Sequence, residues 1–256
     1  MLALVGIGLE SKDISVRALE FLKSCDIIML ESYTSIASME SIDFIERETG
    51  KELVRTRRAD FEDRLKSTVA MAKDKRLAIL AIGDPLMATT HHIILDEAAK
   101  QGIETTVFHA PSIFSAGIGE SGLDIYKFGP TATIPYWSER YKPTSFMDVI
   151  AKNLLNGQHT LVLLDINQPL GKPMDIAEAC ETAAAAAMQS GHSDIMAMRV
   201  LVLADVGRSG QEIVRSMFSE IKSLSESLKG KTISIIVPAK LNFAEEESIK
   251  RFKASA

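Results

Sequence analysis

The chain has 256 residues, of which 46% are hydrophobic and 25% are charged, and its formal net charge is -5 at pH 7. This balance is that of a globular protein that buries a core without disulfides or metals, and it excludes a largely disordered chain. The negative charge disfavours a broad nucleic-acid-binding surface, so a protein or small-molecule substrate is expected. The length favours two domains over one.

Export, membrane insertion and redox chemistry have no clear signal in the sequence. The segment 1–8 carries no basic residue and is cut short by glycine, which indicates a first strand and not a signal peptide. No run approaches the roughly 20 apolar residues of a membrane-spanning helix. Cys25 and Cys180 have no CxxC partner and fit structural thiols in a reducing compartment. We therefore expect a cytoplasmic protein with no membrane role.

In the first hundred residues, short apolar runs rich in β-formers alternate with helical patterns, which is typical of a parallel sheet covered by helices. Strands are predicted at 3–6, 27–30, 53–56, 77–82 and 105–108. Helices of about a dozen residues, the usual crossover length of βαβ units, are predicted between these strands, such as 14–24 and 61–73. This half is therefore expected to be one α/β domain.

Pro111 stops the fifth strand, and Ser112 is placed to cap a new helix, so a domain boundary is predicted here. We expect an N-terminal α/β domain at 1–110 and a C-terminal α/β domain at 111–256. In the second domain the predicted strands are 131–134, 160–165, 200–204 and 232–237, and the predicted helices are 146–156, 175–189 and 244–253. The fold class is thus α/β with two domains.

Gly6 and Gly8 lie between the first strand and the first helix, where glycine lets a backbone approach a nucleotide or sugar. The third glycine of a dinucleotide-binding fingerprint is replaced by Ser11, so that pattern fails. Glu31, at the end of the second strand, is placed to accept a hydrogen bond from a ribose. A tight turn and a solvated acid explain the same residues without a ligand.

A second turn follows the fourth strand, with Asp84 between a glycine and a proline. The carboxyl ends of strands are where open α/β sheets bind ligands, and an aspartate there can accept from a ligand amine or ribose hydroxyl. Thr89 and Thr90 are placed to cap the next helix. The alternative is an aspartate–proline turn with a threonine cap and no ligand.

The fifth strand ends in a third candidate segment, which opens with His109 and leads into a helix whose free amides face the same edge. His91, His92 and His109 have no acidic or cysteine partners at a metal-ligand spacing, so polar or capping roles are favoured over a metal site. The three strand ends together predict one ligand site.

Seven segments carry a resemblance that runs along the whole chain. They lie at 6–9, 31–35, 83–91, 109–113, 122–129, 159–165 and 238–241. Through them the chain resembles the diphthine synthases, which belong to the tetrapyrrole-methylase-like group of S-adenosylmethionine-dependent methyltransferases. The glycine turns alone indicate only the wider methylase group.

The resemblance implies a two-domain fold with S-adenosylmethionine in the cleft between the domains, in a homodimer. Position by position it implies cofactor contacts, several through backbone groups, at Leu9, Asp84, Met87, Ser112, Ile113, Leu164, Ala204 and Asn242. Asn242 stands where the family usually has histidine, which removes a group that titrates near neutrality. The loop after Ile166 also departs from the family pattern.

The resemblance further implies that the acceptor is a histidine of translation elongation factor 2 that carries an aminocarboxypropyl group, whose amine receives three methyl groups. Such transfers need an uncharged, aligned amine, so positioning and desolvation are expected to supply much of the acceleration without a metal. The proton sink is water or a carboxylate. Asp84, Glu120 and Asp165 are candidates by position only, and none is assigned as the catalytic base.

Three other functions remain open. A precorrin-type tetrapyrrole methyltransferase would share the cofactor site, and a nicotinamide-dependent oxidoreductase is suggested by Gly6, Gly8 and Glu31 but disfavoured by Ser11. A binding protein that has lost activity is the third. Two groups of side chains fit either a substrate surface or a solvated edge. They are the cations Arg55, Arg57 and Arg58 and the pair Tyr126 and Lys127.

Overall fold

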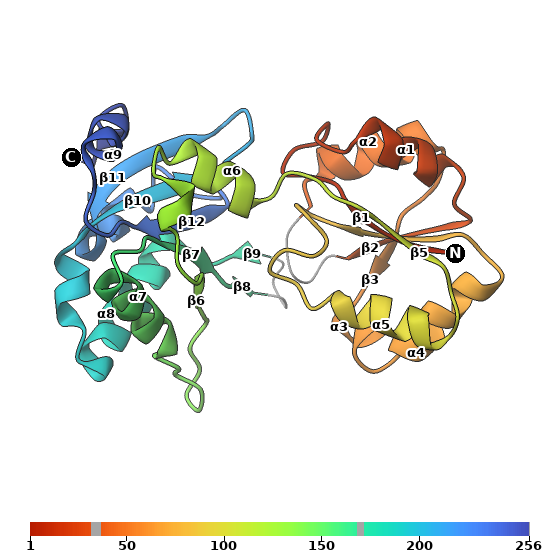
Figure 1. Cartoon of the computed structure of the whole chain (residues 1–256), viewed down its shortest axis with the longest axis horizontal. Helices are drawn as coiled ribbons and strands as arrows, with labels where there is room; N and C mark the ends of the chain where they lie inside the picture. Colours follow the sequence, from red (N-terminus) through yellow and green to blue (C-terminus); the bar gives the residue numbers. More distant parts are fainter. Residues whose placement is uncertain (32–36, 168–171, 256) are drawn as a thin grey trace. The chain divides into compact units, whose positions relative to one another are not determined.

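The computed structural model describes residues 1–31, 37–167 and 172–255. It divides the chain into two compact units, Met1–Phe114 (unit 1) and Ser115–Ala256 (unit 2), which are described separately (Figure 1). Both units are α/β, as the sequence predicts. Across the described ranges, no helix combines the length and apolarity needed to cross a membrane. Of the segments singled out in the sequence, residues 32–36 and 168–171 lie outside the described residues.

Unit 1 is a five-stranded parallel sheet in the order β3-β2-β4-β1-β5, which confirms the predicted parallel architecture. Its strands are β1 (Leu2–Gly6), β2 (Ile27–Glu31), β3 (Val54–Thr56), β4 (Leu77–Ala81) and β5 (Thr105–Phe108). Its helices are α1 (Val16–Lys23), α2 (Met39–Thr49), α3 (Arg58–Phe61), α4 (Leu65–Ala70), the short 3-10 helix η1 (Met71–Lys73) and α5 (His92–Lys100).

The helices of unit 1 cover both faces of the sheet, with α1 and α2 on one face and α3, α4 and α5 on the other (Figure 1). The central strand β1 is buried on both sides because alternate residues enter different cores. Ala3 and Val5 pack in the core under α1 and α2, whereas Leu2 and Leu4 pack in the core under α4 and α5. This two-sided burial explains why β1 is apolar at consecutive positions and not at alternate ones.

The register brings three strand ends together. Gly6 of β1 is level with Ala81 of β4, and Val5 is level with Phe108 of β5. Because the strands are parallel, the turns that follow β1, β4 and β5 all leave from one side of the sheet. We call this side the carboxyl edge of unit 1.

Unit 2 is a six-stranded mixed sheet in the order β13-β11-β10-β12-β7-β6, with a separate two-stranded ribbon of β8 and β9. Its strands are β6 (Ala132–Ile134), β7 (Thr160–Leu164), β8 (Ile166–Asn167), β9 (Lys172–Pro173), β10 (Arg199–Ala204), β11 (Glu212–Met217), β12 (Ile233–Val237) and β13 (Lys253–Ala254). Its helices are α6 (Ile113–Glu120), η2 (Ile125–Lys127), α7 (Ser145–Leu155), α8 (Ile176–Ser190), η3 (Ser193–Ala197), η4 (Phe218–Leu224) and α9 (Phe243–Ile249).

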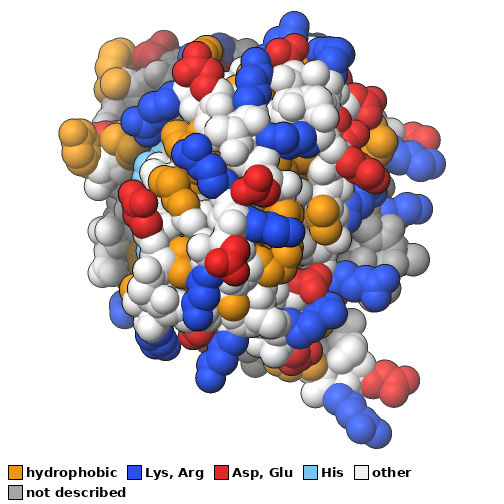
Figure 2. Space-filling model, turned by 90° about the vertical axis from the view of Figure 1, so that its right-hand side faces the viewer, with side chains coloured by type: hydrophobic (Ala, Val, Ile, Leu, Met, Phe, Trp, Pro, Cys, Tyr) orange, Lys and Arg blue, Asp and Glu red, His pale blue; other side chains and the backbone are white. Residues whose placement is uncertain are grey.

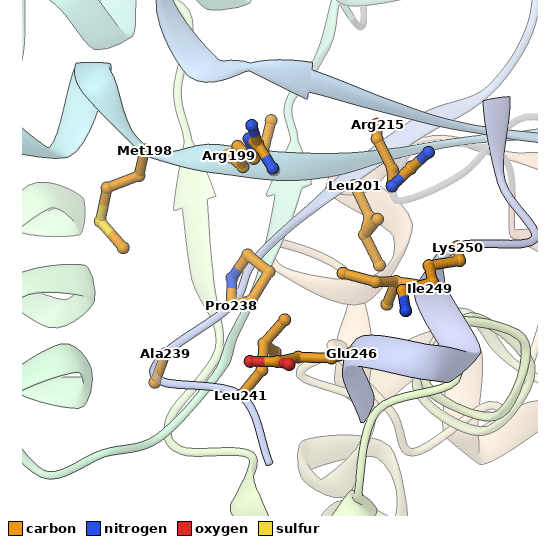
Figure 3. A pocket seen from close by; sticks show the side chains of 11 residues that line it. Met198, Arg199, Leu201, Arg215, Pro238, Ala239, Leu241, Glu246, Ile249 and Lys250 are labelled. Atoms are coloured by element: carbon orange, nitrogen blue, oxygen red, sulfur yellow. The ribbon is translucent and has the colours of Figure 1, made fainter. Parts of the chain in front are cut away.

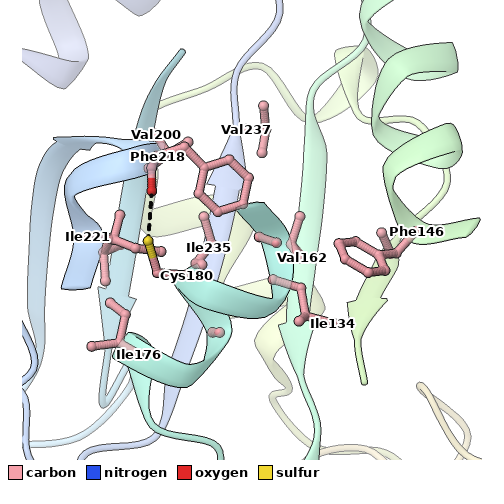
Figure 4. Packing of buried hydrophobic residues seen from close by; sticks show 14 of the residues in the cluster. Ile134, Phe146, Val162, Ile176, Cys180, Val200, Phe218, Ile221, Ile235 and Val237 are labelled. Carbon is pink, nitrogen blue, oxygen red and sulfur yellow. Dashed lines mark hydrogen bonds between the residues drawn. The ribbon is translucent and has the colours of Figure 1, made fainter. Parts of the chain in front are cut away.

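The main core of unit 2 lies between one face of this sheet and α7, α8 and η4 (Figure 4). Helix α8 presents a row of small side chains to the sheet, so the helix can approach it closely. Within this core the Cys180 thiol donates to the carbonyl oxygen of Phe218 at 3.5 Å, and burial raises the pKa of that thiol. Cys180 is therefore a packing residue and not an exposed nucleophile.

The structure corrects several predicted elements. The single helix predicted at 61–73 is three short pieces, and the Thr68 hydroxyl of α4 donates to the Asp60 carbonyl of α3 at 2.9 Å across the break between them. Helix α2 is one of the crossover helices expected between the strands, and Ser38 caps its start while Gly50, at φ 68°, ends it. Strand β11 was missed, since Arg215 interrupts its apolar pattern.

Candidate functional site

The turns after β1 and β4 meet backbone to backbone at the carboxyl edge of unit 1. The Gly8 amide donates to the Gly83 carbonyl at 3.2 Å, and the Gly83 amide donates to the Gly8 carbonyl at 2.8 Å. A Cβ atom on Gly6 would lie 2.6 Å from the Gly83 carbonyl oxygen and 2.9 Å from the Ala110 Cβ. The glycine at position 6 is therefore needed for the turns of three neighbouring strands to approach one another.

The turn that contains Leu9 is closed by its own aspartate. Gly8 has φ +77°, and a Cβ atom there would lie 2.1 Å from the Asp13 Cβ. Oδ2 of Asp13 accepts from the amides of Leu9 and Glu10, each at 2.9 Å. The Leu9 amide thus has a partner within the turn.

Asp84 joins the β4 turn to the loop after β5. Its side chain is buried, with 6% exposed, and Oδ1 accepts from the Leu86 amide at 3.0 Å. Oδ2 accepts from Nδ1 of His109 at 2.8 Å and from the Ala110 amide at 3.3 Å. These bonds occupy three of the roughly four lone-pair positions of a carboxylate. Asp84 therefore shapes the carboxyl edge through contacts within the protein.

A buried histidine, His91, is hydrogen-bonded to the same turn. Nδ1 of His91 and the Thr89 hydroxyl both donate to the Pro85 carbonyl, at 2.8 and 2.7 Å. Among the described residues, the other ring nitrogen of His91 has no hydrogen-bond partner, and it lies 3.9 Å from a carboxylate oxygen of Glu31. Glu31 is fully buried, which rules out the solvated acid considered in the sequence analysis.

Five of the eight sequence-predicted cofactor contacts belong to unit 1, and four of them lie in or beside these turns: Leu9, Asp84, Met87 and Ser112. Met87 follows the β4 turn with half of its side chain exposed. A Cβ atom on Gly83 would lie 3.4 Å from the buried Ser112, which places Ser112 against the same turn. Ile113, the fifth residue, opens α6 directly after Ser112.

In unit 2 the sheet brings together two of the three remaining predicted residues. Strands β7 and β10 flank β12 and are both antiparallel to it, so they run in the same direction. Their last residues, Leu164 and Ala204, therefore lie at one end of the sheet, on either side of the start of β12. We call this the Leu164 end of unit 2.

Asn242 is not part of that group. It follows β12 and begins α9, so it lies beyond the opposite end of the strand. Its Oδ1 accepts from the Glu245 amide at 2.9 Å, which makes it the N-cap of α9. The residue that the sheet does bring to the Leu164 end is Thr232, whose amide donates to Asp205 Oδ1 at 2.9 Å. Only the pairing of β10 with β12 places Thr232 beside Ala204, so no local sequence pattern marks this position.

The three carboxylates named earlier as candidate proton acceptors differ in their hydrogen bonds and in their exposure. Asp165 accepts from the Ile166 amide at 2.8 Å and from the Tyr136 amide at 3.0 Å. The Asp84 carboxylate accepts three hydrogen bonds, from the Leu86 amide, the His109 ring and the Ala110 amide. Glu120, the third, is exposed at the last turn of α6.

A buried charged cluster of His159, Glu245 and Lys127 lies at the α9 side of unit 2. Nε2 of His159 donates to Glu245 at 2.9 Å, and Nδ1 of the same ring accepts from the Ala239 amide at 2.9 Å. Nζ of Lys127 donates to Glu245 at 2.6 Å. Lys127 is thus a structural partner of Glu245. This ion pair explains the position of Lys127 without a substrate.

The pKa values in this cluster are shifted by burial and by these bonds. Burial raises the pKa of Glu245, but hydrogen bonds from Lys127, the Asn242 amide and His159 outweigh it and lower the pKa to about 2. Burial lowers the pKa of His159, and Glu245 opposes that shift only in part. The cluster therefore holds an ionised Glu245 and a neutral His159.

A pocket of about 420 Å³ lies on the other face of the unit 2 sheet, opposite the main core (Figure 3). Leu201 and Arg215 of β10 and β11 form its floor, and Leu241 and Ile249 enclose it from the α9 side. None of the sequence-predicted site residues lines it. The pocket is therefore separate from the residues gathered at the Leu164 end.

Metal ligation finds no support in the described part of the chain. No group of three or more His, Cys, Asp or Glu side chains there is arranged to hold a metal ion. The geometry instead presents backbone turns, a carboxylate and an imidazole at the end of a parallel sheet.

Comparison with known proteins places this geometry in a family. The model of the Tetrapyrrole (Corrin/Porphyrin) Methylases matches residues 1–222. The chain is 35% identical over 249 residues to a diphthine synthase of Methanothermobacter thermautotrophicus, covering 96% of this chain and 93% of that one. It is 36% identical over 252 residues to a diphthine synthase of Methanococcus aeolicus, covering 98% and 97%.

Solved structures agree with the sequence comparison. A crystal structure of diphthine synthase superposes with a TM-score of 0.88 at 31% identity, covering 99% of this chain and 96% of that one. The expectation of a methyltransferase is confirmed, and the expectation of a nicotinamide-dependent oxidoreductase finds no support. The chain belongs to the tetrapyrrole (corrin/porphyrin) methylases, within the group of the diphthine synthases, and is a methyltransferase.

Proposed function

We propose that this methyltransferase uses S-adenosylmethionine to methylate the amine of an aminocarboxypropyl-histidine on translation elongation factor 2, giving diphthine. The full-length similarity to proteins named diphthine synthase carries this proposal. We further propose that the protein is cytoplasmic and works as a homodimer, as the resemblance implies.

The carboxyl edge of unit 1 fits the methyl donor. Its turns are held so close that Gly6 has no room for a Cβ atom, and they bring carbonyl and amide groups to one edge of the sheet. Such groups suit a ligand that carries amine, carboxylate and hydroxyl groups, and the exposed thioether of Met87 offers an apolar contact. When bound, S-adenosylmethionine supplies an electrophilic methyl group.

In this proposal the unit 1 residues bind and position. Leu9, Met87, Ser112 and Ile113 contact the cofactor, and Asp84 keeps the β4 turn and the β5 loop in place for it. Leu164 and Ala204 stay predicted contacts from unit 2. Thr232 replaces Asn242 as the third predicted contact, because it shares the end of the sheet with the other two.

A protein or small-molecule substrate, and not a nucleic acid, fits the charge of the chain. The net charge is -5, and basic and acidic side chains are interspersed on the face drawn in Figure 2. Nucleic-acid-binding proteins gather their basic residues on one face or along a groove. The acceptor is therefore expected to dock through mixed polar and apolar contacts.

The test is methyl transfer from labelled S-adenosylmethionine to purified elongation factor 2 that carries the aminocarboxypropyl histidine. Unmodified factor is the control for the acceptor group, and a precorrin is the control for the tetrapyrrole alternative. Label on the modified factor alone supports the proposal. Label on the tetrapyrrole, or saturable cofactor binding with no transfer to the factor, rejects it.

A further inference from the structure

The proposed reaction requires that a proton be removed from the acceptor ammonium. A primary amine with a pKa near that of lysine, about 10, is an ammonium at neutral pH and has no lone pair to attack a methyl group. A side chain that removes this proton must be exposed, must have an unprotonated acceptor atom and must be held in one orientation. His109 meets these three conditions.

The imidazole of His109 is exposed and oriented. Its side chain is 66% exposed, and its Nδ1 lies 2.8 Å from Oδ2 of the buried Asp84. A carboxylate only accepts, so Nδ1 carries the proton of this bond. The neutral ring then has its lone pair on Nε2, which makes no hydrogen bond with any residue that the structure describes.

The position of His109 agrees with this role. It is the first residue after β5, at the carboxyl edge of unit 1, and it precedes Ser112 and Ile113, two predicted cofactor contacts. Its carboxylate partner sits in the β4 turn. The imidazole is therefore attached to the two loops that would hold the methyl donor.

The other histidines of the described chain lack one of the three conditions. His91 has a nitrogen without a partner but is only 1% exposed. His159 uses both ring nitrogens and is fully buried. His192 is bonded to Asp148 on the surface of unit 2 through Nε2. His92 opens α5 and has no carboxylate partner among the described residues to orient it.

The charged group in contact with the His109 ring is a carboxylate. Asp84, from the β4 turn, contacts the ring directly. Asp13, from the β1 turn, is already bonded to two backbone amides, and Arg17 of α1 stacks over the Phe108 ring at 5.1 Å. The anionic partner is thus the one in contact with the ring, where it orients the imidazole.

We propose that His109 is the general base of the methyl transfer and that Asp84 is its positioning residue. Nε2 takes a proton from the acceptor ammonium, which leaves a lone pair on the acceptor nitrogen. That nitrogen forms a bond to the methyl carbon as the carbon–sulfur bond breaks and the electron pair stays on sulfur. The imidazolium then releases its proton to solvent, to which it is open. This inference rests on the proposed function.

The test compares His109→Gln with the unaltered enzyme in single-turnover methyl transfer at saturating cofactor. We expect His109→Gln to lower the rate at neutral pH about 100-fold, the lower end of the range for general acid–base catalysis. Its cofactor affinity, measured by calorimetry without acceptor, should stay unchanged. The matched control is His192→Gln, which removes an exposed imidazole from another His–Asp pair and should transfer at the normal rate.

The pH profile separates a base from a merely structural residue. The unaltered enzyme should reach its full rate at a lower pH than the variant does, because it has a side chain that accepts the proton of the acceptor ammonium. The variant should keep rising with pH until the acceptor amine itself loses its proton. Added imidazole should restore part of the rate to His109→Ala, since it supplies the missing base.

Asp84→Asn tests the positioning residue. An amide N–H facing Nδ1 would stabilise the tautomer with its proton on Nε2, so ¹⁵N resonances of the His109 ring in the cofactor-free protein should change tautomer. The double variant should be no slower than the slower single variant, because both act on one proton transfer.

The outcomes distinguish the two proposals. No transfer by the unaltered enzyme overturns the proposed function, and this inference with it. Transfer by the unaltered enzyme, with His109→Gln unchanged in rate and pH profile and His109→Ala insensitive to imidazole, overturns only the role of His109. A thermal unfolding curve for each variant confirms that the fold is intact.

Discussion

His109 and His159 each hydrogen-bond a buried carboxylate, but only one of the two imidazoles has a nitrogen left for a ligand. In unit 2, His159 is fully buried and both ring nitrogens are used. Its partner Glu245 accepts four hydrogen bonds, which fills the lone pairs of a carboxylate. In unit 1, His109 is mostly exposed and Nε2 faces outward from its bond to Asp84.

The difference lies in where the sequence puts each pair. His159 precedes β7 and Glu245 lies in the first turn of α9, and both side chains are buried in the folded unit 2. His109 and Asp84 both follow the ends of parallel strands, where loops stay open to ligands. The same chemical pair therefore stabilises the fold in unit 2 and, in our proposal, handles a proton in unit 1.

Glu245→Ala is expected to have the largest effect on stability. It removes the acceptor of His159 Nε2 and leaves that buried donor without a partner, while Lys127 keeps only its bond to the Lys240 carbonyl at 2.9 Å. Breaking a buried ion pair from one side costs about 3 kcal/mol of unfolding free energy or more. Urea denaturation followed by circular dichroism measures the loss. The neighbouring Glu246→Ala, an exposed residue, is the control and should change stability by less than about 0.5 kcal/mol.

If Glu245→Ala and Glu246→Ala unfold at the same urea concentration, the buried cluster does not stabilise unit 2. The His159–Glu245 pair would then have no demonstrated role in the stability of the fold. A drop in methyl transfer without a drop in stability would point to the same conclusion.

Acidification should act on the same cluster. The folded pKa of Glu245, about 2, lies below its ordinary value of 4.5, so the folded protein binds fewer protons in that range. Its contribution is complete above 4.5 and is lost as pH falls from 4.5 towards 2, by about 3 kcal/mol in total. The lowered pKa of His159 also makes the folded state less stable as pH falls. Below the ordinary value of 6.5, unfolding lets the imidazole take up a proton that the folded state does not bind.

Calorimetric melting temperatures between pH 7 and pH 3 measure this loss. His159→Gln should flatten the upper part of the decline, below about pH 6.5, because the buried imidazole no longer contributes. A variant that declines as steeply as the unaltered protein over that part would show that His159 is not responsible for it. The control is His192→Gln, whose imidazole lies at the surface and should leave the curve unchanged.

Asp84→Ala should affect binding more than the fold, the reverse of Glu245→Ala. It removes the acceptor of the Leu86 and Ala110 amides, which costs about 1 to 2 kcal/mol of unfolding free energy. Separation of the two loops should weaken cofactor affinity about tenfold, which corresponds to about 1.4 kcal/mol. Calorimetric titration with S-adenosylmethionine measures this effect. Unchanged affinity would contradict the placement of the cofactor at the carboxyl edge of unit 1.

The parallel sheet of unit 1 and its turns could be predicted because each signal is local. Strand β1 is apolar at consecutive positions, and glycine stands where the backbones of two turns touch. The bond between His109 and Asp84 could not be predicted, since 25 residues separate them and only the register of β1 with β4 and β5 brings their loops together.

The sheet of unit 2 was harder to predict because its pairing is antiparallel and non-local. Strand β11 contains Arg215, whose Nε donates to the Phe252 carbonyl at 2.9 Å, so a charge inside a strand is satisfied by a segment 37 residues away. The place of Thr232 beside Ala204 could not be predicted for the same reason, whereas Asn242 was expected from the family resemblance. Single-sequence patterns report periodicity and turns, but they do not report which strands become neighbours.

Asn242→Ala makes the smallest predicted change and tests which residue belongs to the site. Asn242 caps α9 by accepting from the Glu245 amide at 2.9 Å, and loss of such a cap costs about 1 kcal/mol. Cofactor affinity should stay unchanged, whereas Thr232→Val, at the Leu164 end, should weaken it. Urea denaturation and calorimetric titration of both variants separate the two roles. A loss of affinity in Asn242→Ala but not in Thr232→Val would return Asn242 to the site, and it would mean that α9, the helix that holds Glu245, serves the ligand as well as the fold.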